Sequence, residues 1–580
     1  MAKKLVQAVI PKWRYYLVIL FLASLPLVLL VKIAQLQILP SQEHGVDFLQ
    51  NQGDSRAIRN ITIPAYRGLI TDRNGEPLAI STPVTAIIAN PQQIRDEDVR
   101  QVAKAIKVSE SQLKTKLQRY RKKSFMVLVP QLSSDEAEII LDLNISGVSA
   151  KKTYKRFYPA GEVTAQLVGF TNYKDIGQEG MELAYDDWLT GEEGEKKVVI
   201  DRSKRVINDI SLIKAAKSGE ELRLSIDLRV QYAAYRALKK SVKKHNAKSG
   251  SVVVLDVLTG EVLAMVNQPS FNPNDRTHLR QDAVRNRAMT DLMEPGSTVK
   301  PFTMMAALES GKFSPETLIN TSPGYLKVDY KTFVDPVNYG ELSLAGVLAK
   351  SSQVGTTKVA LELNPEFTRE LFQRVGFGEV IGSGFPGETV GNLPAYRKWD
   401  QVTQATFAFG YGLSVSSLQL ARAYSVLAND GVLKDVSLVA LDSEQASQRV
   451  IDAEISQKVR RMLRAASGVS GTGKRAMIDG YSVGGKTGTL HKVKTGGGYD
   501  ESRYMSAFAG LSPAVNPRLV TVVVIDEPRD GSYFGGLVAA PVFSEVTGSA
   551  LRLLQVTPDQ IDANRSVAGI PKLIKKRGES

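Results

Sequence analysis

The hydrophobic pattern of the chain opens with a run of uncharged residues, 15–31, that follows four basic residues. Apolar positions resume after Lys32 and continue to residue 39. A run of about 17 apolar residues is the shortest that spans a bilayer as a helix, and basic residues before such a helix stay in the cytoplasm. A signal peptide has a similar pattern, but no small-residue cleavage site follows this run. We therefore predict that residues 1–40 form a cytoplasmic N-terminus and an uncleaved transmembrane anchor.

Between residues 41 and 215 the pattern alternates between short strand-like runs and charged helical stretches. A strand enters the turn pair Asn74-Gly75 and residues 76–81 return as its partner, which predicts a hairpin. No catalytic constellation occurs in this region, so we predict a non-catalytic pedestal domain. The predicted strands are residues 86–89 and 125–129, and the predicted helices are residues 96–105, 109–121 and 180–191.

Residues 216–565 contain longer and more apolar strands. Two of them, 250–255 and 261–267, are joined by Leu258-Thr-Gly260, which is a strong hairpin signal. Two strands early in this region and three late in it indicate one antiparallel sheet with helices inserted between them. We therefore predict an α+β protein whose third part is a five-stranded antiparallel sheet packed between helices, followed by a basic tail over residues 566–580. The other predicted strands are residues 222–226, 481–490, 504–511 and 518–525, and the predicted helices include residues 228–244, 343–349, 356–363, 416–429 and 541–554.

Composition narrows the chemistry. At 580 residues the chain has room for two or three domains, and 43% hydrophobic with 23% charged residues is typical of globular proteins. It contains no cysteine, which excludes disulfides, thiolate zinc sites and cysteine nucleophiles. Its four histidines have no metal-ligand spacing, so we predict no metal and no cofactor. No groove-reading motif accompanies the net charge of +14, which favours an anionic cell envelope over nucleic acid.

Ser297 and Lys300 lie in the segment Glu294-Pro-Gly-Ser-Thr-Val-Lys-Pro-Phe-Thr303, where a Pro-Gly pair predicts the start of a helix. Lys300 is one helical turn beyond Ser297 and therefore on the same face. A lysine whose pKa is lowered by burial or by nearby cations can take the proton of a serine, which activates the serine as a nucleophile. The helix N-terminus also offers free N–H groups to an oxyanion. The Ser-x-x-Lys spacing alone is weak, because it recurs at Ser111, Ser149, Ser211 and Ser241, which we interpret as ordinary surface positions.

Two downstream segments give this pair its context. Lys350-Ser-Ser-Gln-Val-Gly355 follows it, and Gly484-Gly-Lys-Thr-Gly-Thr489 comes later, at a predicted strand edge. The three segments together match the Ser-x-x-Lys, Ser-Asp-Asn-like and Lys-Thr-Gly motifs of penicillin-recognising serine enzymes. A second Lys-Thr-Gly, at residues 494–496, is discounted because it lies in a glycine-rich run and we predict no strand before it. A Ser-His-Asp triad stays open as an alternative, but no motif supports it.

The chain resembles the class B penicillin-binding proteins, and in particular their division-specific branch. Besides the three motifs, the resemblance rests on the anchor and on segments 66–75, 158–162, 409–413 and 533–536, so it covers nearly the whole chain. No glycosyltransferase domain is recognised before the pedestal, unlike in the class A enzymes. The resemblance implies a peptidoglycan D,D-transpeptidase that cleaves the D-Ala–D-Ala bond of a stem peptide and that β-lactam antibiotics inhibit covalently.

The resemblance also implies a role for each motif residue. Ser297 is the expected nucleophile, Lys300 its base, and Ser351 a proton relay to the leaving amine. Lys486 is expected to keep Lys300 neutral and to attract the substrate carboxylate. Gln353 departs from the family pattern, since most relatives carry asparagine at this position. The expected substrate-binding residues are Gln353, Thr487, Gly488 and Thr489.

The resemblance further implies a single-pass protein of the bacterial inner membrane, with its catalytic domain in the periplasm at the division septum. The implied partners are stem peptides, β-lactams, the SEDS-family glycosyltransferase FtsW and other divisome membrane proteins, with no nucleic acid. Three alternatives stay open, namely an elongation-specific class B transpeptidase, a β-lactamase or penicillin sensor, and a catalytically idle scaffold. The long pedestal disfavours the second, and the complete set of Ser297, Lys300 and Lys486 disfavours the third.

Overall fold

The computed structural model describes residues 11–38, 47–48, 57–201, 206–396, 398–494 and 496–560. Three features predicted from the sequence lie outside these residues: the first basic residues, Lys3 and Lys4, the end of the apolar run at residue 39, and the basic tail over residues 566–580. The chain divides into two compact units. The first comprises Met1–Tyr66, Pro83–Tyr154 and Gly191–Ser218, and the second comprises Arg67–Thr82, Lys155–Thr190 and Gly219–Ser580.

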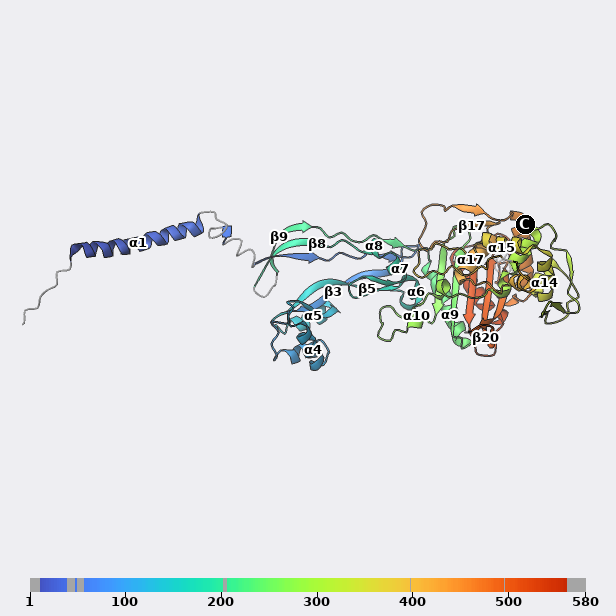
Figure 1. Ribbon diagram of the computed structural model, residues 1–580, viewed down its shortest axis with the longest axis horizontal. Coiled ribbons are helices and arrows are strands. Elements are labelled where there is room, and N and C mark those ends of the chain that lie inside the picture. Colours follow the sequence, from blue (N-terminus) through green and yellow to red (C-terminus); the bar gives the residue numbers. More distant parts are fainter. Residues whose placement is uncertain are drawn as a thin grey trace, which may run out of the picture. The chain divides into compact units, whose positions relative to one another are not determined.

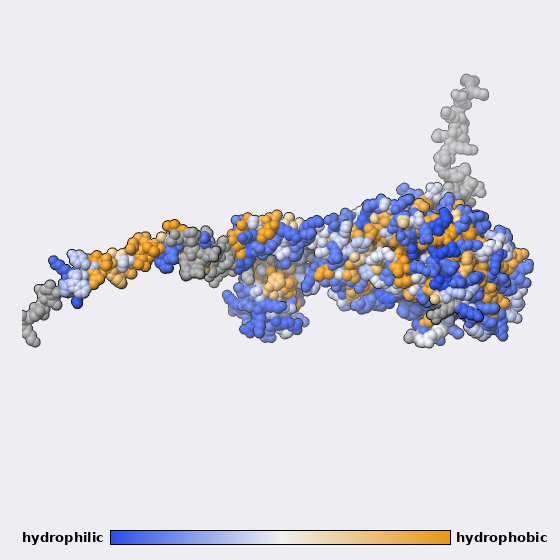
Figure 2. Space-filling view, turned by 45° about the horizontal axis from the view of Figure 1, so that its top comes forward, coloured by the Kyte–Doolittle hydropathy of each residue, from blue (hydrophilic) through white to orange (hydrophobic). Residues whose placement is uncertain are grey.

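The helix α1, Lys12–Gln37, contains 26 residues, and none of them is buried. Figure 2 shows its surface as a nearly continuous apolar band. Within the residues that the structure describes, it is the one helix that is long and apolar enough to cross a membrane. So much exposed apolar surface is unfavourable in water and favourable in a bilayer, where a helix also satisfies its own backbone groups. The predicted N-terminal apolar helix is confirmed.

The first unit contains a three-stranded antiparallel sheet with the order β1-β8-β9. It also contains the pair β3–β4, packed with three helices around a small core that includes Ile87, Leu113 and Ile140. The strands predicted at 86–89 and 125–129 and the helices predicted at 96–105 and 109–121 are present. The bounds are β1 Ile58–Ile63, β3 Pro77–Ala89, α3 Val99–Ala105, α4 Glu110–Tyr120, β4 Met126–Leu132, α5 Ser134–Leu141, β5 Val148–Phe157, β8 Gly194–Ile200 and β9 Val206–Lys214, and β3 and β5 contain residues of both units.

The second unit begins with the predicted hairpin. β2, Ile70–Thr71, pairs antiparallel with the start of β3, so that Ile70 lies opposite Ala79. The turn between them ends at Gly75, whose φ of 86° is a conformation that glycine adopts without a Cβ clash. The helix predicted at 180–191 is present as two short helices, α7 Gly180–Ala184 and α8 Asp186–Leu189.

A buried charge triad fixes these segments of the second unit. Glu182 of α7 accepts from the Nε atoms of Arg67 and Arg156, each at 2.7 Å and each through a different carboxylate oxygen. All three side chains are at most 2% exposed. A buried carboxylate between two guanidinium groups is stable only because every charge has a close partner. Asp186 also pairs with Arg67, at 2.7 Å, so that two carboxylates face the two guanidinium groups and the cluster positions the hairpin and α7 without a free charge.

The centre of the second unit is a five-stranded antiparallel sheet with the order β12-β11-β21-β20-β19, which confirms the predicted sheet. Figure 1 shows the early strands, in green, beside the late strands, in orange and red. Every residue of β11 is buried because helices cover both faces of the sheet. Val252 packs with residues of α9 and α20, whereas Val253 packs with residues of α12 and α17. The strands are β11 Ser249–Asp256, β12 Val262–Gln268, β19 Gly484–Val493, β20 Tyr499–Ser512 and β21 Leu519–Asp526.

The helices predicted in this unit are present, and α9 has the predicted bounds. Sequence reasoning misses α15 and α18, and it misses small strands between residues 318 and 449. The main helices are α9 Leu228–Lys244, α12 Lys300–Glu309, α13 Leu344–Lys350, α14 Gln353–Glu362, α15 Pro365–Arg374, α16 Gln401–Phe407, α17 Ser417–Ala428, α18 Ala453–Ser467 and α20 Ala540–Leu553. The missed small strands are β13 Leu318–Asn320, β14 Tyr325–Val328, β15 Lys331–Val334, β16 Glu341–Ser343, β17 Val432–Lys434 and β18 Ser447–Arg449. Three further small strands lie earlier in the unit, β6 Phe170–Thr171, β7 Gly177–Glu179 and β10 Leu222–Arg223.

Candidate active site

Ser297 lies in a tight turn at the start of the buried helix α12. Gly296–Val299 form a 3-10 turn and the α-helix begins at Lys300, so the first turn is 3-10 and not the α-helical turn that the sequence predicts. The hydroxyl of Tyr424, which is fully buried on α17, donates to the carbonyl of Thr298 at 2.7 Å. This contact holds the turn against the core, while Ser297 itself is only half-buried. Part of Ser297 is therefore exposed to solvent.

Lys300 is completely buried although it carries an amine. Its Nζ donates to the carbonyl of Ser351 at 2.7 Å, to the hydroxyl of Ser351 at 3.3 Å and to the carbonyl of Ser352 at 3.3 Å. Burial disfavours the charged form and lowers the pKa of Lys300 to about 7, although the negative charge of Asp335 acts in the opposite direction. An amine with this pKa is a suitable general base near neutral pH.

The hydrogen bonds of Lys300 do not include the hydroxyl of Ser297 in the described part of the chain. The sequence spacing predicts that the two groups lie side by side, and the structure places them in one site without a direct bond. Catalytic hydrogen bonds are often long before substrate is bound and tighten only in the complex. The amine therefore points toward Ser351 in this state.

Ser351 connects α13 to α14 in the left-handed conformation, with φ at 59°. Such a conformation costs a non-glycine residue roughly 1–3 kcal/mol and persists only where neighbours impose it. The carboxylate of Asp335 supplies one such constraint, because it caps the start of α14. It accepts from the Ser352 hydroxyl at 2.5 Å and from the N–H groups of Gln353 at 2.6 Å and Val354 at 3.2 Å.

Asp335 is a residue of the candidate site that sequence reasoning misses. It is 4% exposed, and its negative charge raises the pKa of Lys300 while its oxygens hold the segment that carries Ser351. Asp335 follows a short strand, and no local sequence pattern predicts that it contacts a helix further along the chain. Only the folded structure shows this contact.

Gln353 is the first residue of α14, and its side chain is exposed. Asp335 binds its backbone N–H, whereas no hydrogen bond to its amide group is present within the described residues. The amide is therefore available to a ligand at the edge of the same site.

Lys486 is the second fully buried lysine of the site, and it lies on the edge strand β19. Its Nζ donates to the carbonyl of Thr487 at 3.2 Å and lies 3.5 Å from the hydroxyl of the same residue. Burial and, to a lesser degree, the positive charge of Lys300 lower the pKa of Lys486 well below its usual value. The positive charge of Lys300 therefore disfavours the charged form of Lys486.

The rest of β19 closes the site. A Cβ on Gly488 would lie 2.9 Å from Cγ2 of Thr298, so only glycine lets the strand pack this closely on the turn that carries Ser297. The hydroxyl of Thr489 accepts from the N–H of Gly535 at 3.0 Å, which brings the predicted 533–536 segment to the strand. The hydroxyl of Thr487 lies 2.9 Å from that of Thr472.

The prediction for the second Lys-Thr-Gly sequence, at residues 494–496, is wrong in one respect. We predict no strand before it, but β19 runs to Val493 and Lys494 follows directly. The hydrophobic run ends at Leu490, which hides the polar end of this long hairpin strand. Lys494 is exposed, and its N–H donates to the carbonyl of Gly498 in the turn. It lies beyond the buried part of the strand, in contrast to Lys486.

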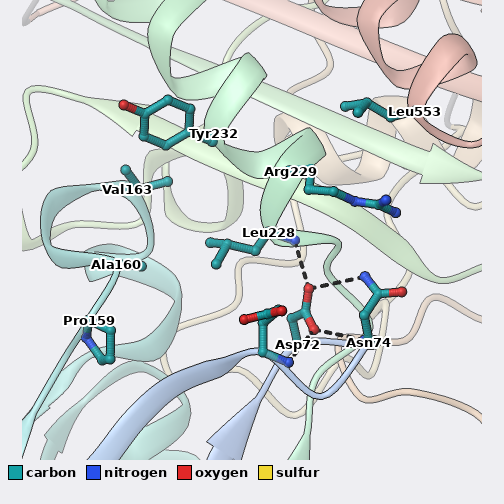
Figure 3. A pocket seen from close by; sticks show the side chains of 10 residues that line it. Asp72, Asn74, Pro159, Ala160, Val163, Leu228, Arg229, Tyr232 and Leu553 are labelled. Carbon is teal, nitrogen blue, oxygen red and sulfur yellow. Dashed lines mark hydrogen bonds between the residues drawn. The ribbon is translucent and has the colours of Figure 1, made fainter.

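A separate cavity of about 750 Å³ lies in the same unit, between the hairpin turn and the start of α9. Figure 3 shows it, with Leu228 and Tyr232 of α9 across from Pro159. The carboxylate of Asp72 accepts from the N–H groups of Asn74, Glu76 and Leu228 at 2.7–3.0 Å. Both oxygens of this carboxylate are therefore already bonded within the protein. None of the predicted site residues lines this cavity.

Comparison with known proteins agrees with this geometry. Residues 250–548 match the family "Penicillin binding protein transpeptidase domain", and residues 62–224 match the family "Penicillin-binding Protein dimerisation domain". The chain is 43% identical over 529 residues to the probable peptidoglycan D,D-transpeptidase PbpC of Pseudomonas aeruginosa, which covers 91% of this chain and 94% of that protein. It is 39% identical over 556 residues to the peptidoglycan D,D-transpeptidase FtsI of Escherichia coli K12, and the alignment covers 95% of this chain and 93% of that protein.

Two solved structures show the same fold. The transpeptidase domain of Burkholderia pseudomallei penicillin-binding protein 3 aligns with a TM-score of 0.54 at 41% identity and covers 58% of this chain and 98% of that one. A peptidoglycan synthetase from Bifidobacterium adolescentis aligns with a TM-score of 0.68 at 26% identity and covers 87% and 98%. With both domains matched and full-length relatives at this level of identity, the chain belongs to the class B penicillin-binding proteins.

Proposed function

We propose that this protein is a peptidoglycan D,D-transpeptidase of the division machinery that works through an acyl-enzyme on Ser297. The hydroxyl of Ser297 attacks the carbonyl between the two terminal D-alanines of a stem peptide, and the last D-alanine leaves. An amine of a neighbouring strand then takes the acyl group and frees the serine. The observation that carries this proposal is a fully buried amine, Lys300, with a pKa lowered to about 7, one turn beyond the half-buried Ser297.

The proton path follows from the same contacts. Lys300 takes the proton of Ser297 during attack, since it is largely neutral above its lowered pKa. The hydroxyl of Ser351, 3.3 Å from Nζ of Lys300, is in reach to pass a proton to the leaving amine. An arriving substrate carboxylate favours the charged form of Lys486, which then attracts that carboxylate and disfavours protonation of Lys300.

The remaining residues of the site position the substrate. The hydroxyls of Thr487 and Thr489 donate to the substrate carboxylate, and Gly488 keeps the strand close to the nucleophile. The N–H groups of Ser297 and Thr489 hold the developing oxyanion, where fixed donors have their largest effect on rate. A β-lactam is expected to acylate Ser297 in the same geometry and to block turnover.

Similarity to FtsI over 95% of this chain supports the division role. In that role α1 anchors the protein in the inner membrane, and the rest of the chain lies in the periplasm. The expected partners are the SEDS-family glycosyltransferase FtsW and other membrane proteins of the divisome.

Localisation tests the division role. A fluorescent fusion of the full chain is expected to form a band at the septum, and its depletion is expected to give filaments. The same fusion with Ser297→Ala separates recruitment from catalysis, because it should still reach the septum. Signal along the lateral wall, with round cells on depletion, would instead assign the protein to elongation.

We expect the side-chain amide of Gln353 to contact the substrate as the asparagine amide does in most relatives. Both amides offer the same donor and acceptor groups, and the extra methylene of glutamine costs rotamer entropy. Gln353→Ala is therefore expected to acylate about tenfold or more slowly with penicillin or a thioester substrate, as for the loss of a positioned contact. Gln353→Asn is expected to be no faster than the parent. An alanine variant with the parental acylation rate would remove Gln353 from the site.

A further inference from the structure

A second pocket of about 460 Å³ lies on the catalytic unit, lined by α15, α17 and the hairpin β17–β18. We name it the basic pocket, because its lining residues include three arginines, Arg374, Arg422 and Arg449, and one carboxylate, Glu379. None of the residues that we assign to the catalytic site lines it. The remaining lining residues are Gln373, Gly376, Val380, Leu433, Gln448 and Val450.

Arg422 is a buried cation without an adequate partner. It is 7% exposed, and its Nε is buried with no hydrogen-bond partner. Its two other contacts are long, at 3.5 Å from Nη1 to the carbonyl of Val380 and 3.4 Å from Nη2 to Asp435. Normal bonds of this kind are about 2.9–3.0 Å. The side chain of Asp435 is 64% exposed, so water screens its charge.

The charge of Arg422 is therefore poorly compensated. Desolvation lowers the pKa of its guanidinium below the usual value and outweighs the attraction of Asp435, Glu379 and Glu388. Buried charges normally have a close and fully bonded partner, as Arg67 does in this protein. An anion that enters the pocket gains more binding free energy from an uncompensated guanidinium than from one that is already paired.

The neighbouring side chains leave this charge open to the pocket. Arg374 is neutralised by Glu309, with N–O distances of 2.5 and 3.0 Å. Arg449 is exposed and donates from Nη1 only to backbone carbonyls, at 2.6 Å to that of Asp430, with no ion pair among the described residues. Gly376 has φ at 100°, and a Cβ there would lie 3.3 Å from Nη1 of Arg422. Any larger residue at this position would therefore crowd the guanidinium.

We propose that the basic pocket binds an oxyanion, either a phosphate or a carboxylate group, between Arg422 and Arg449. The planar guanidinium fork matches both groups through paired N–H donors. α17 also carries Tyr424, which holds the turn of Ser297 through Thr298. A bound oxyanion therefore stabilises the helix that supports the nucleophile, from a site outside the catalytic cleft.

Thermal unfolding and calorimetry of the full chain in detergent test the proposal, with inorganic phosphate, glycerol phosphate and citrate as probes at constant ionic strength set by sodium chloride. The parent is expected to show a saturable rise in Tm. Arg449→Gln removes one exposed side chain and should bind the best probe at least tenfold more weakly, and folded Arg422→Gln should do the same. Arg461→Gln, an exposed arginine of α18 outside the pocket, is the matched control and should bind like the parent.

The probes distinguish the sources of the oxyanion. Tightest binding of glycerol phosphate indicates a phospholipid headgroup, tightest binding of inorganic phosphate indicates a free ion, and tightest binding of citrate indicates a carboxylate ligand. Absence of saturable binding to all three in the parent overturns the proposal. Equal binding by the parent and both pocket variants overturns it as well. Neither result depends on penicillin acylation, so the proposed function is tested separately.

Discussion

The Ser297→Ala variant is expected to lose covalent penicillin labelling completely and to keep its fold. The hydroxyl oxygen forms the acyl bond, and the other hydroxyl of the turn, that of Thr298, is buried and donates to the carbonyl of Pro295. The side chain is half-buried, and its hydroxyl has no hydrogen bond within the described residues, so its loss should change stability by only about 0.5 kcal/mol. Gel fluorescence with a fluorescent penicillin and the intact mass of the treated protein measure the result.

Ser111→Ala is the matched control for this variant. Ser111 belongs to another Ser-x-x-Lys sequence, but it lies on the exposed surface of α4. The control should label with one penicillin per chain, and the labelled peptide of the parent should contain Ser297. Stoichiometric labelling of Ser297→Ala, with the adduct on another residue, would disprove the proposed nucleophile.

Elements with strong internal patterns could be predicted from the sequence. α9 has the predicted bounds because Asp227 caps it and a regular apolar stripe follows. The two hairpin strands β11 and β12 are clear because each has an apolar centre, residues 252–255 and 262–266, and a Thr-Gly turn joins them. α18 is missed although Asp452 caps it in the same way and an apolar stripe follows, as in α9. Strands of three or four residues, such as β14, depend on their partner and have no signal of their own.

The catalytic motifs could be located along the chain, but their electrostatics could not be predicted. The complete burial of Lys300 and Lys486 results from helices and strands far apart in the sequence. The contact of Asp335 with the segment of Ser351 and that of Tyr424 with the nucleophile turn are also long-range. Motif spacing therefore predicts which groups react, whereas only the packing of the fold determines their protonation.

Acylation by the parent is expected to rise with pH and to reach half its maximum near the Lys300 pKa of about 7. The base accepts a proton only in its neutral form, so the rate should fall about tenfold for each pH unit further below this value. Lys300→Gln is expected to slow acylation roughly 10²–10⁴-fold and to remove this pH dependence. Second-order acylation rates with a reporter β-lactam between about pH 5 and 9 measure both effects.

Asp335→Asn tests the electrostatic part of this prediction. Because the negative charge of Asp335 raises the pKa of Lys300, its removal should move the half-maximal pH downward. The asparagine oxygen can still accept from the N–H of Gln353, which limits damage to α14. Asp329→Asn, an exposed carboxylate on the same small hairpin, is the control and should leave the midpoint in place. A parental rate that does not change with pH would contradict Lys300 as the base, and an upward shift in Asp335→Asn would contradict the assigned effect of its charge.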